Sequence, residues 1–449
     1  MPEENKEEKL KFLKREEIRT MEKDIKRLRE VEAEKERERV SALETEKKKV
    51  RVMPPTEVEI PPKETILPKP PKKSSPKEKI LVRIGIVLIF LFILAFFYWF
   101  FLVKNLSLQE FIKKPVKEIE KTEIVVPLPL IPVSEEKVGQ LFIVGFEGKT
   151  LTKDLENFFK KYKPGGVLLL SKNVENRDQL KKLISDLQNL SLKETGLPLF
   201  IAVDQEGGQI SRIGFANEKT PQSQIKNNEE AFQVGQKRGK ELKELGVNLN
   251  LAPVLDDMKS EDFYFNRTFQ KSPEIVGELS KALILGQKSA EILTAIKHFP
   301  GYVGIGFNPE ASLAILEKIP EISQFKIAME SKPEFVLGAN AIYKEVNSSL
   351  PFTFSQEGIQ FLKNNLGPEI LIISDDLDQN SLINKFPLKE IMIKPIEAGV
   401  DLLIFSGYRL PVEQGLDTFF EAVKNKEISE TKLNEKIAKI IEFKQNLLK

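Results

Sequence analysis

The sequence predicts an α/β protein built as a (β/α)8, TIM-like barrel, preceded by a single transmembrane helix and a charged, proline-rich N-terminal segment. Two observations predict the barrel. Short apolar segments alternate with segments of helical periodicity from about residue 134 onward. Several apolar segments also run straight into charged residues, as Leu199–Val203 runs into Asp204. Buried parallel strands are continuous apolar runs, and functional side chains gather at their carboxyl ends.

Eight short segments, rich in branched and aromatic residues, are the strand candidates. They are Leu141–Gly145, Gly166–Leu170, Leu199–Val203, Leu249–Val254, Thr294–Ile296, Phe335–Gly338, Ile370–Ile373 and Asp401–Phe405. Helical periodicity lies between them, for example in Asp178–Leu187, Ala231–Leu245 and Gly358–Leu366. A doubly wound open sheet also alternates in this way, but no Gly-x-Gly-x-x-Gly turn follows the first strand candidate. The pattern therefore favours a barrel.

Composition excludes several classes of protein. The formal net charge of +2 indicates no nucleic-acid partner. The chain has no cysteine, which excludes disulfides, thiolate zinc sites and cysteine nucleophiles, and its single histidine excludes multi-histidine metal sites. We expect no metal and no cofactor. Acid–base chemistry must therefore rest mainly on carboxylates.

The first 104 residues do not share the barrel pattern. Residues 1–52 are dense in Lys, Arg and Glu, and residues 53–79 are rich in proline and lysine. We expect a charged exposed helix followed by an extended linker, together forming a cytoplasmic segment over residues 1–79.

Ile84–Val103 contains 20 successive residues without a charge. At about 1.5 Å per residue, such a helix crosses a hydrocarbon core of about 30 Å. We expect a transmembrane helix over residues 80–104, a linker over 105–133 and the barrel over 134–449. Lysine and arginine residues between Lys69 and Arg83 favour a cytoplasmic N-terminus. The barrel is therefore predicted to lie outside the cytoplasm of a single-pass protein of the cell membrane.

Charged residues follow four of the strand candidates. Asp204 follows the third, Arg267 the fourth, Lys297 and His298 the fifth, and Asp375 and Asp376 the seventh. Each residue type also has an ordinary structural role: an Asp caps a helix, a lone His is a hydrogen-bonded core residue and an Arg is a surface charge. Their common position favours a shared site. Because successive side chains on a strand alternate, only one of the two aspartates is expected to face the barrel mouth.

Several motifs occur in one order along the predicted barrel. They are Val138–Gly145, Ala202–Gly208 with Arg212, Leu251–Asp256, Asn266–Thr268, Lys297–Gly301, Ser374–Leu377 and Ala398–Asp401. This arrangement resembles the catalytic barrel of family 3 glycoside hydrolases. It is most similar to the single-domain bacterial β-N-acetylglucosaminidases, or β-N-acetylhexosaminidases, that trim murein fragments.

The resemblance implies a role for each matching residue. Asp375 corresponds to the nucleophile. The residues implied to bind sugar hydroxyls and the acetamido group are Asp204, Arg212, Arg267, Lys297 and His298. The implied reaction proceeds through an oxocarbenium-like transition state and a covalent glycosyl-enzyme, with a second group as general acid and then base.

One loop departs from the family pattern. In these enzymes the loop after Pro-Gly begins with His-Gly and holds an Asp-x-His pair as general acid/base. Here Tyr302 follows Pro300-Gly301, and Asn308 and Glu310 take the positions of the pair. Glu310 is our candidate acid/base, since a carboxyl group fills this role elsewhere. The alternative is that Glu310 belongs to the first turn of a helix over Ala311–Lys318, capped by Asn308.

Two functions are therefore open. The first is a membrane-anchored retaining β-N-acetylhexosaminidase acting on amino-sugar glycans of the envelope, including peptidoglycan fragments. The alternative is a catalytically weak or inactive relative that binds glycan as an envelope scaffold. In both cases, the second expected partner is the lipid bilayer, through Ile84–Val103.

Overall fold

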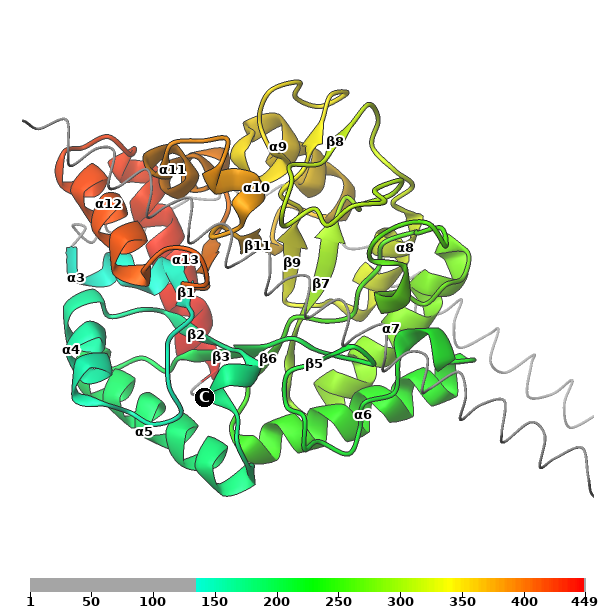
Figure 1. The fold of residues 1–449 in the computed structure, drawn as a ribbon, viewed down its shortest axis with the longest axis horizontal. Coiled ribbons are helices and arrows are strands. Elements are labelled where there is room, and N and C mark those ends of the chain that lie inside the picture. Colours follow the sequence, from blue (N-terminus) through cyan, green and yellow to red (C-terminus); the bar gives the residue numbers. More distant parts are fainter. Residues whose placement is uncertain (1–134, 448–449) are drawn as a thin grey trace, which may run out of the picture. The chain divides into compact units, whose positions relative to one another are not determined.

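The computed structural model describes residues 135–447, which form a closed barrel of eight parallel strands with helices around it (Figure 1). The strands succeed one another around the barrel in chain order. They are β1 (Phe142–Val144), β2 (Gly166–Leu169), β3 (Phe200–Val203), β6 (Leu249–Asn250), β7 (Leu293–Phe299), β9 (Phe335–Gly338), β11 (Leu371–Asp376) and β12 (Leu402–Phe405). Each predicted strand segment overlaps one of these strands, so the (β/α)8 barrel is confirmed.

Helices connect successive barrel strands and cover the outside of the barrel (Figure 1). They are α3 (Glu135–Val138), α4 (Lys153–Tyr162), α5 (Arg177–Thr195), α6 (Asn228–Leu245), α7 (Pro273–Ser289), α8 (Ser323–Ala328), α9 (Gln356–Leu366), α10 (Asn380–Ile383), α11 (Leu388–Ala398), α12 (Val412–Lys424) and α13 (Glu430–Leu447). The three predicted helical segments lie within α5, α6 and α9. Each predicted segment is shorter than the helix that contains it, because the spacing of apolar residues reveals the buried face of a helix but not where the helix begins and ends.

Local chemistry defines the starts of four helices. The side chain that precedes each one accepts a hydrogen bond from a backbone N–H of the first turn, which satisfies a donor that the helix itself leaves free. These caps are Thr152 for α4, Asn176 for α5, Asn227 for α6 and Ser355 for α9. Gly196 and Gly246 end α5 and α6 in the left-handed conformation.

Two barrel strands contain an extra residue near the carboxyl end. Strand β7 advances three residues from Ile296 to Phe299 while its neighbour β9 advances two. Strand β11 likewise advances three residues from Ile373 to Asp376 while β12 advances two. Such a bulge breaks the alternation of side chains along a strand. Consecutive residues at these two places can therefore face the same side.

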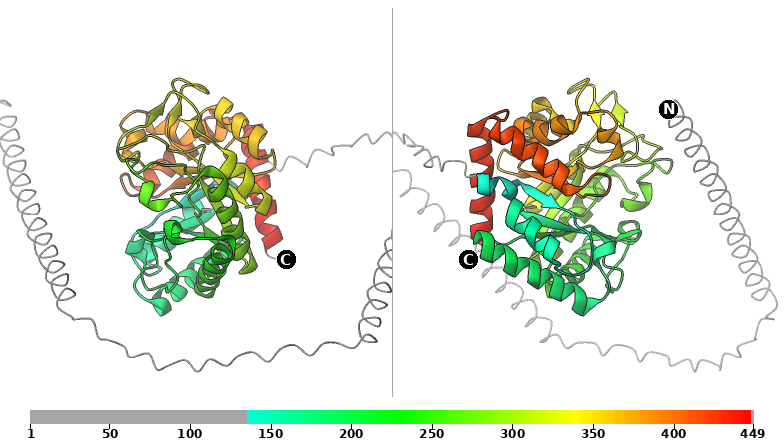
Figure 2. Two further views of the ribbon diagram at one scale, coloured as in Figure 1. Left: turned by 90° about the vertical axis from the view of Figure 1, so that its right-hand side faces the viewer. Right: turned by 60° about the vertical axis from the view of Figure 1, so that its left-hand side comes forward.

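Helix α13 closes the end of the barrel where the strands begin (Figure 2). Its Phe443 packs against Phe200 and Phe335, the first residues of β3 and β9, with ring centroids 6.1 and 5.4 Å apart. The next residue, Lys444, is completely buried and donates hydrogen bonds to Gln140 Oε1 at 2.8 Å and to the carbonyl oxygen of Gly165 at 2.6 Å. Only the opposite end of the barrel is left for a site.

The predicted helix over Ala311–Lys318 is wrong. Asn308 does cap a turn, since its side chain accepts from the N–H of Glu310 at 3.0 Å and its carbonyl accepts from Ala311. The turn does not continue, because the chain then extends into β8 (Ile315–Leu316) and pairs in parallel with β10 (Ile342–Tyr343). Tertiary pairing overrides the local helix signal here. Glu310 therefore lies in a turn.

The fourth strand is also shorter than predicted. The segment Leu249–Val254 forms a strand only over Leu249–Asn250, and Val254 makes an isolated bridge to Lys297. Pro253 lies between them and has no N–H to donate to a ladder. The strand prediction thus holds for position and order but overestimates this length.

The predicted N-terminal regions lie outside the described residues. These regions are the charged segment 1–79, the transmembrane helix over 80–104, with its apolar core Ile84–Val103, and the linker 105–133. Within residues 135–447, none of the helices combines the length and the apolar character needed to cross a bilayer.

Candidate active site

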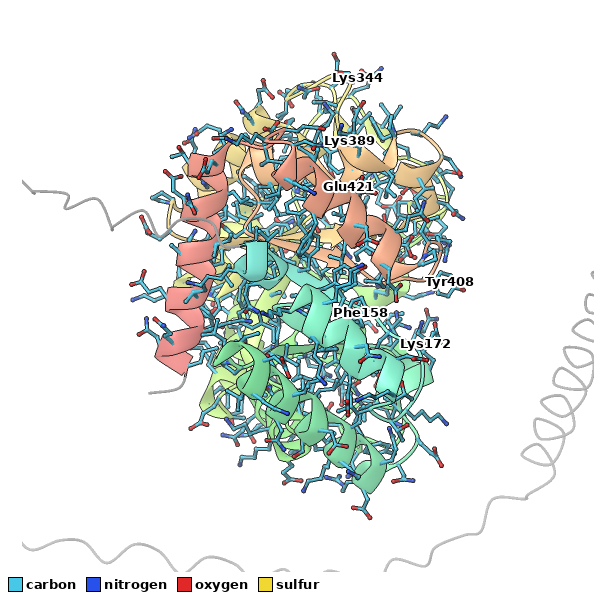
Figure 3. All side chains as sticks on the ribbon, turned by 90° about the vertical axis from the view of Figure 1, so that its left-hand side faces the viewer. Phe158, Lys172, Lys344, Lys389, Tyr408 and Glu421 are labelled. Atoms are coloured by element: carbon cyan, nitrogen blue, oxygen red, sulfur yellow. The ribbon has the colours of Figure 1, made fainter. Side chains whose placement is uncertain are left out.

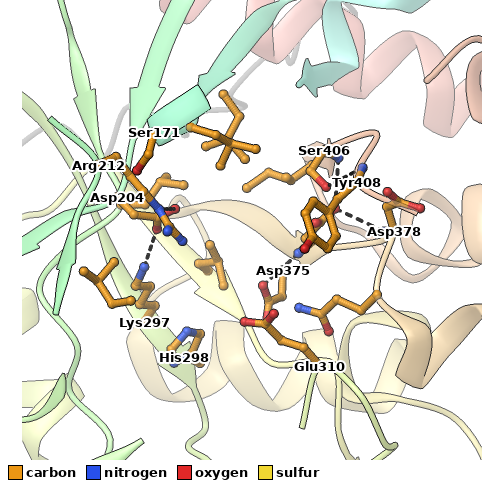
Figure 4. Close-up of a pocket in the computed structure, with 18 of the residues that line it drawn as sticks. Ser171, Asp204, Arg212, Lys297, His298, Glu310, Asp375, Asp378, Ser406 and Tyr408 are labelled. Carbon is orange, nitrogen blue, oxygen red and sulfur yellow. Dashed lines mark hydrogen bonds and ion pairs between the residues drawn. The ribbon is translucent and has the colours of Figure 1, made fainter. Parts of the chain in front are cut away.

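A cavity of about 520 Å³ opens at the carboxyl ends of the barrel strands (Figure 4). All seven residues singled out from the sequence line it: Asp204, Arg212, Arg267, Lys297, His298, Glu310 and Asp375. They come from β7, β11 and the segments after β3, β6 and β7, which lie far apart in the chain. The barrel therefore brings the whole predicted set together.

The two bulged strands each present two consecutive side chains to this cavity. Lys297 and His298 of β7 both line it, and so do Asp375 and Asp376 of β11. The expectation that only one of the two aspartates faces the barrel mouth is therefore wrong. Simple alternation would have turned one member of each pair away, and the bulge removes that restriction.

Glu206 organises the cations on one wall of the cavity. Its carboxylate accepts two hydrogen bonds from Arg267, from Nη2 at 2.7 Å and from Nε at 3.0 Å, and lies 2.7 Å from Lys297 Nζ. Lys297 also donates to Asp204 Oδ1 at 2.6 Å, and Arg212 Nε lies 3.9 Å from Asp204 Oδ2. Burial opposes the ionisation of Glu206, but the charges of Arg267 and Lys297 lower its pKa to about 2. A fixed carboxylate thus holds two cations in place.

Asp256 orients His298. Its Oδ2 lies 2.8 Å from His298 Nδ1 and accepts from the His298 backbone N–H at 3.1 Å, while its Oδ1 accepts from the backbone N–H of Tyr302 at 2.7 Å. Burial favours the neutral acid, but the interaction with His298 and these hydrogen bonds lower the pKa of Asp256. His298 Nε2 lies 3.4 Å from Arg267 Nη2. These partners assign the proton to Nδ1 and leave Nε2 as an acceptor.

The carboxyl groups of Asp375 and Glu310 form no ion pair with the residues that the structure describes, and they face the cavity from different elements (Figure 4). Asp375, on β11, accepts from the hydroxyl of Tyr302 at 3.3 Å through Oδ2 and from the N–H of Asp376 at 2.7 Å through Oδ1. Glu310, in the turn after β7, accepts from the hydroxyl of Tyr264 at 3.1 Å. Burial raises the pKa of both tyrosines well above their usual value, so each remains a neutral donor.

A third carboxyl group lies beside Asp375. Asp376 Oδ1 accepts from the backbone N–H groups of Asp378 at 3.1 Å and Ser406 at 3.0 Å. Burial raises the pKa of Asp376 to about 7, although these hydrogen bonds act in the opposite direction. Asp376 thus holds backbone from two loops together beside Asp375.

Sequence reasoning assigned no role to four residues that shape this site. They are Glu206, Asp256, Tyr264 and Tyr302. The two acids had a signal, because each lies a few residues beyond a strand candidate and inside a quoted motif. The sequence gives no signal for the two tyrosines, because a tyrosine in a loop does not follow the regular spacing of a strand or helix.

Comparisons with known proteins agree on one family. The model of the glycosyl hydrolase family 3 N-terminal domain matches residues 133–443. The β-hexosaminidase A of Pseudoalteromonas piscicida is 28% identical over 339 residues, which are 66% of this chain and 56% of that protein. The β-hexosaminidase of Neisseria meningitidis serogroup B is 31% identical over 262 residues, which are 54% of this chain and 70% of that protein. The chain thus spans little more than half the length of the first relative.

Solved structures show the same fold. A family 3 β-N-acetylglucosaminidase from Paenibacillus sp. str. FPU-7 superimposes with a TM-score of 0.65 at 27% identity, covering 69% of this chain and 62% of that one. A β-N-acetylhexosaminidase from Beutenbergia cavernae gives a TM-score of 0.64 at 23% identity, covering 70% of this chain and 99% of that one. The latter similarity supports the fold alone.

Proposed function

Because the chain belongs to glycosyl hydrolase family 3, we propose that it is a retaining glycoside hydrolase that removes β-linked N-acetylglucosamine-type sugars from glycans of the cell envelope, including peptidoglycan fragments. One observation supports this function above the others. The carboxyl groups of Asp375 and Glu310 line one cavity from two separate elements, and each accepts a hydrogen bond from a different buried tyrosine. Retaining hydrolysis needs two such carboxyl groups.

The proposed reaction has two steps. Asp375 attacks the anomeric carbon and forms an ester with the sugar, while Glu310 gives a proton to the departing oxygen. Glu310 then takes a proton from water, which attacks the anomeric carbon and releases the sugar from Asp375. The same side chain thus acts first as acid and then as base.

We assign the binding of the cleaved sugar to the opposite set of polar groups. Asp204, Arg212, Arg267, Lys297 and His298 would hold its hydroxyl and acetamido groups. Lys297 and His298 are 2% and 4% exposed and therefore reach a ligand only at the floor of the cavity. The ion pairs of Lys297 with Asp204 and Glu206, and the hydrogen bond of His298 to Asp256, fix these two side chains before a ligand binds, which reduces the entropy lost on binding.

The configuration of the first product tests this proposal. An activated aryl N-acetyl-β-glucosaminide is hydrolysed in the presence of the full-length chain and followed by proton NMR. The β-anomer is expected to appear before mutarotation produces the α-anomer. Initial release of the α-anomer would contradict the two-step mechanism, because direct attack by water inverts the anomeric carbon.

A second function, glycan binding without efficient turnover, is favoured by one observation. The positions of the usual Asp-x-His pair hold Asn308 and Glu310. The two functions differ in rate and not in binding. Turnover of a natural disaccharide supports the hydrolase, whereas binding of that disaccharide without turnover supports a scaffold.

We further propose that residues 84–103 anchor the chain in the cell membrane, with residues 1–79 in the cytoplasm and the barrel outside. The support is the uncharged stretch Ile84–Val103 and the basic residues that precede it. A reporter that is active only outside the cytoplasm, fused after Lys449, is expected to be active. A reporter active only in the cytoplasm would contradict this orientation.

A further inference from the structure

The mouth of the cavity carries an aromatic side chain that the proposed mechanism does not use. Tyr408 lines the cavity, yet 68% of its surface is exposed. Figure 3 shows Tyr408 and Lys172 at the end of the domain opposite α13, where both lie at the cavity. A single exposed aromatic ring is ordinary by itself, but one that lines a cavity offers a flat apolar face, with a polar hydroxyl, to whatever enters.

Two contacts orient Tyr408. The guanidinium carbon of Arg409 lies 4.0 Å from the centroid of the Tyr408 ring and covers one of its faces. A hydrogen bond of 3.3 Å connects the N–H of Tyr408 to Ser406 Oγ. Only the second face of the ring is thus left for a ligand.

The loop that bears Tyr408 is also tied to the segment after Asp375. The buried carboxylate of Asp378 accepts from the N–H groups of Arg409 at 2.6 Å and Leu410 at 2.9 Å. Asp376 accepts from the N–H of Ser406 at 3.0 Å, at the start of the same loop. The loop between β12 and α12 is therefore built onto the strand that carries Asp375.

Depth in the cavity separates the two parts of a substrate. Lys297 and His298 are almost completely buried and lie at the floor, whereas Tyr408 is mostly exposed and lies at the mouth. A sugar cleaved at Asp375 must sit at the floor, so the group attached to it extends toward the mouth. The geometry of Tyr408 suits the apolar C–H face of a pyranose ring, which packs flat on an aromatic ring.

We propose that Tyr408 is a specificity-determining residue, the platform on which the sugar on the leaving-group side of the cleaved bond stacks. This inference rests on the proposed hydrolase function and names the residue that selects the second sugar. It makes the protein prefer a disaccharide or longer glycan over a monosaccharide with a small substituent. The proposed contact is the stacking of that second sugar on the ring, and it does not depend on whether the sugar is charged.

Binding to a variant without the nucleophile tests the platform directly. Full-length Asp375→Asn is titrated by calorimetry with N-acetylglucosamine and with its β-1,4-linked disaccharide. Adding Tyr408→Ala is expected to weaken disaccharide binding about threefold to tenfold and to leave monosaccharide binding unchanged. Tyr408→Phe, the matched control, keeps the ring and is expected to retain disaccharide affinity. Unchanged disaccharide affinity in Tyr408→Ala, or an equal loss for both sugars, would overturn the proposal.

Turnover separates this inference from the proposed function. If the wild-type chain hydrolyses no disaccharide but binds it in a Tyr408-dependent way, the hydrolase proposal fails and the platform stands. If the wild-type chain hydrolyses the disaccharide but Tyr408→Ala changes neither its KM nor its affinity, the platform fails and the hydrolase stands.

Discussion

The hydroxyl group of Tyr264 lies 3.1 Å from Glu310 Oε1, and the ring of Tyr264 stacks on His298 with centroids 5.5 Å apart. The guanidinium carbon of Arg267 lies 4.2 Å from the centroid of the same ring. Tyr264 thus touches Glu310 and two residues of the proposed sugar-binding set. This contact places Glu310 in the site, although the local sequence around it also fits the start of a helix.

Replacing Glu310 by glutamine tests its role as acid/base. Glu310→Gln is expected to reduce hydrolysis of substrates with poor leaving groups far more than hydrolysis of activated aryl glycosides, since only the former need a proton from the enzyme. Azide should partly restore turnover of the activated substrates, because it attacks the glycosyl-enzyme without a general base. Steady-state kinetics on both substrate types measures this.

The opposite result has a clear meaning. If Glu310 serves only to stabilise its turn, Glu310→Gln should impair both substrate classes equally and azide should have no effect. Together with weak turnover of natural substrates by the wild type, that outcome would favour the glycan-binding function.

Replacing Asp375 by asparagine tests the nucleophile. Asp375→Asn is expected to abolish turnover and to retain sugar binding, because the amide keeps the shape of the side chain but cannot form the ester. A fluorinated substrate analogue should label Asp375 of the wild-type chain, as detected by peptide mass spectrometry. Asp376→Asn is the neighbouring control and should leave that label in place. Normal turnover in Asp375→Asn would refute the assignment.

The low pKa of Glu206 predicts that acid lowers the stability of the domain. Its folded-state pKa of about 2 lies below the ordinary value of 4.5, so its contribution to stability is complete above pH 4.5 and is lost as the pH falls toward 2. Glu206→Gln is expected to lower the free energy of unfolding at pH 7 by about 3–5 kcal/mol, because it removes the carboxylate between two buried cations. Urea unfolding between pH 3 and 7 measures both effects.

An exposed ion pair provides the control for Glu206. Glu244 pairs with Arg177 at 3.1 Å on the surface. Glu244→Gln should change the free energy of unfolding little, because exposed ion pairs contribute little. Similar losses in the two variants would contradict the central role of Glu206.

The buried Lys444 predicts a pH dependence of the same sign, but at neutral to alkaline pH. Burial lowers its pKa to about 7, whereas the ordinary value is 10.5. The unfolded chain therefore binds more protons between pH 7 and 10.5, and stability should rise with pH over that window. Lys444→Met removes this buried charge, which destabilises the wild type only where Lys444 is protonated. The free energy of unfolding of the variant, minus that of the wild type, should therefore be larger at pH 6 than at pH 9. Thermal unfolding at the two pH values, with the exposed Lys181→Met as control, measures the difference.

The sequence was sufficient for the barrel and for the seven residues that we singled out as candidates, but not for the four residues that support them. Apolar runs such as Ile370–Ile373 reveal buried strands directly, and eight such runs that alternate with helical segments favour a barrel. The position of a charged residue after a strand then predicts the end of the barrel at which it lies. The family resemblance supplied the individual roles of Asp375 and the sugar-binding residues, and these roles remain predictions.

The features that were predicted wrongly depend on contacts between residues that are distant in the sequence. No local pattern shows that β11 gains an extra residue against β12, and so the orientation of Asp376 was predicted wrongly. The pairing of Ile315–Leu316 with β10 is equally non-local, and it replaced the expected helix beside Glu310. Such errors concentrate at the cavity, where the regular alternation of the barrel is interrupted.

The position of helix α13 has a practical consequence for handling the protein. It covers the end of the barrel opposite the cavity, and it contacts α3, the first described helix, so the chain enters and leaves the domain on that covered side. A solid support or fluorescent label joined at the end of α13 is therefore attached away from the mouth. Immobilisation through the end of α13 is expected to leave the entrance free for a large ligand.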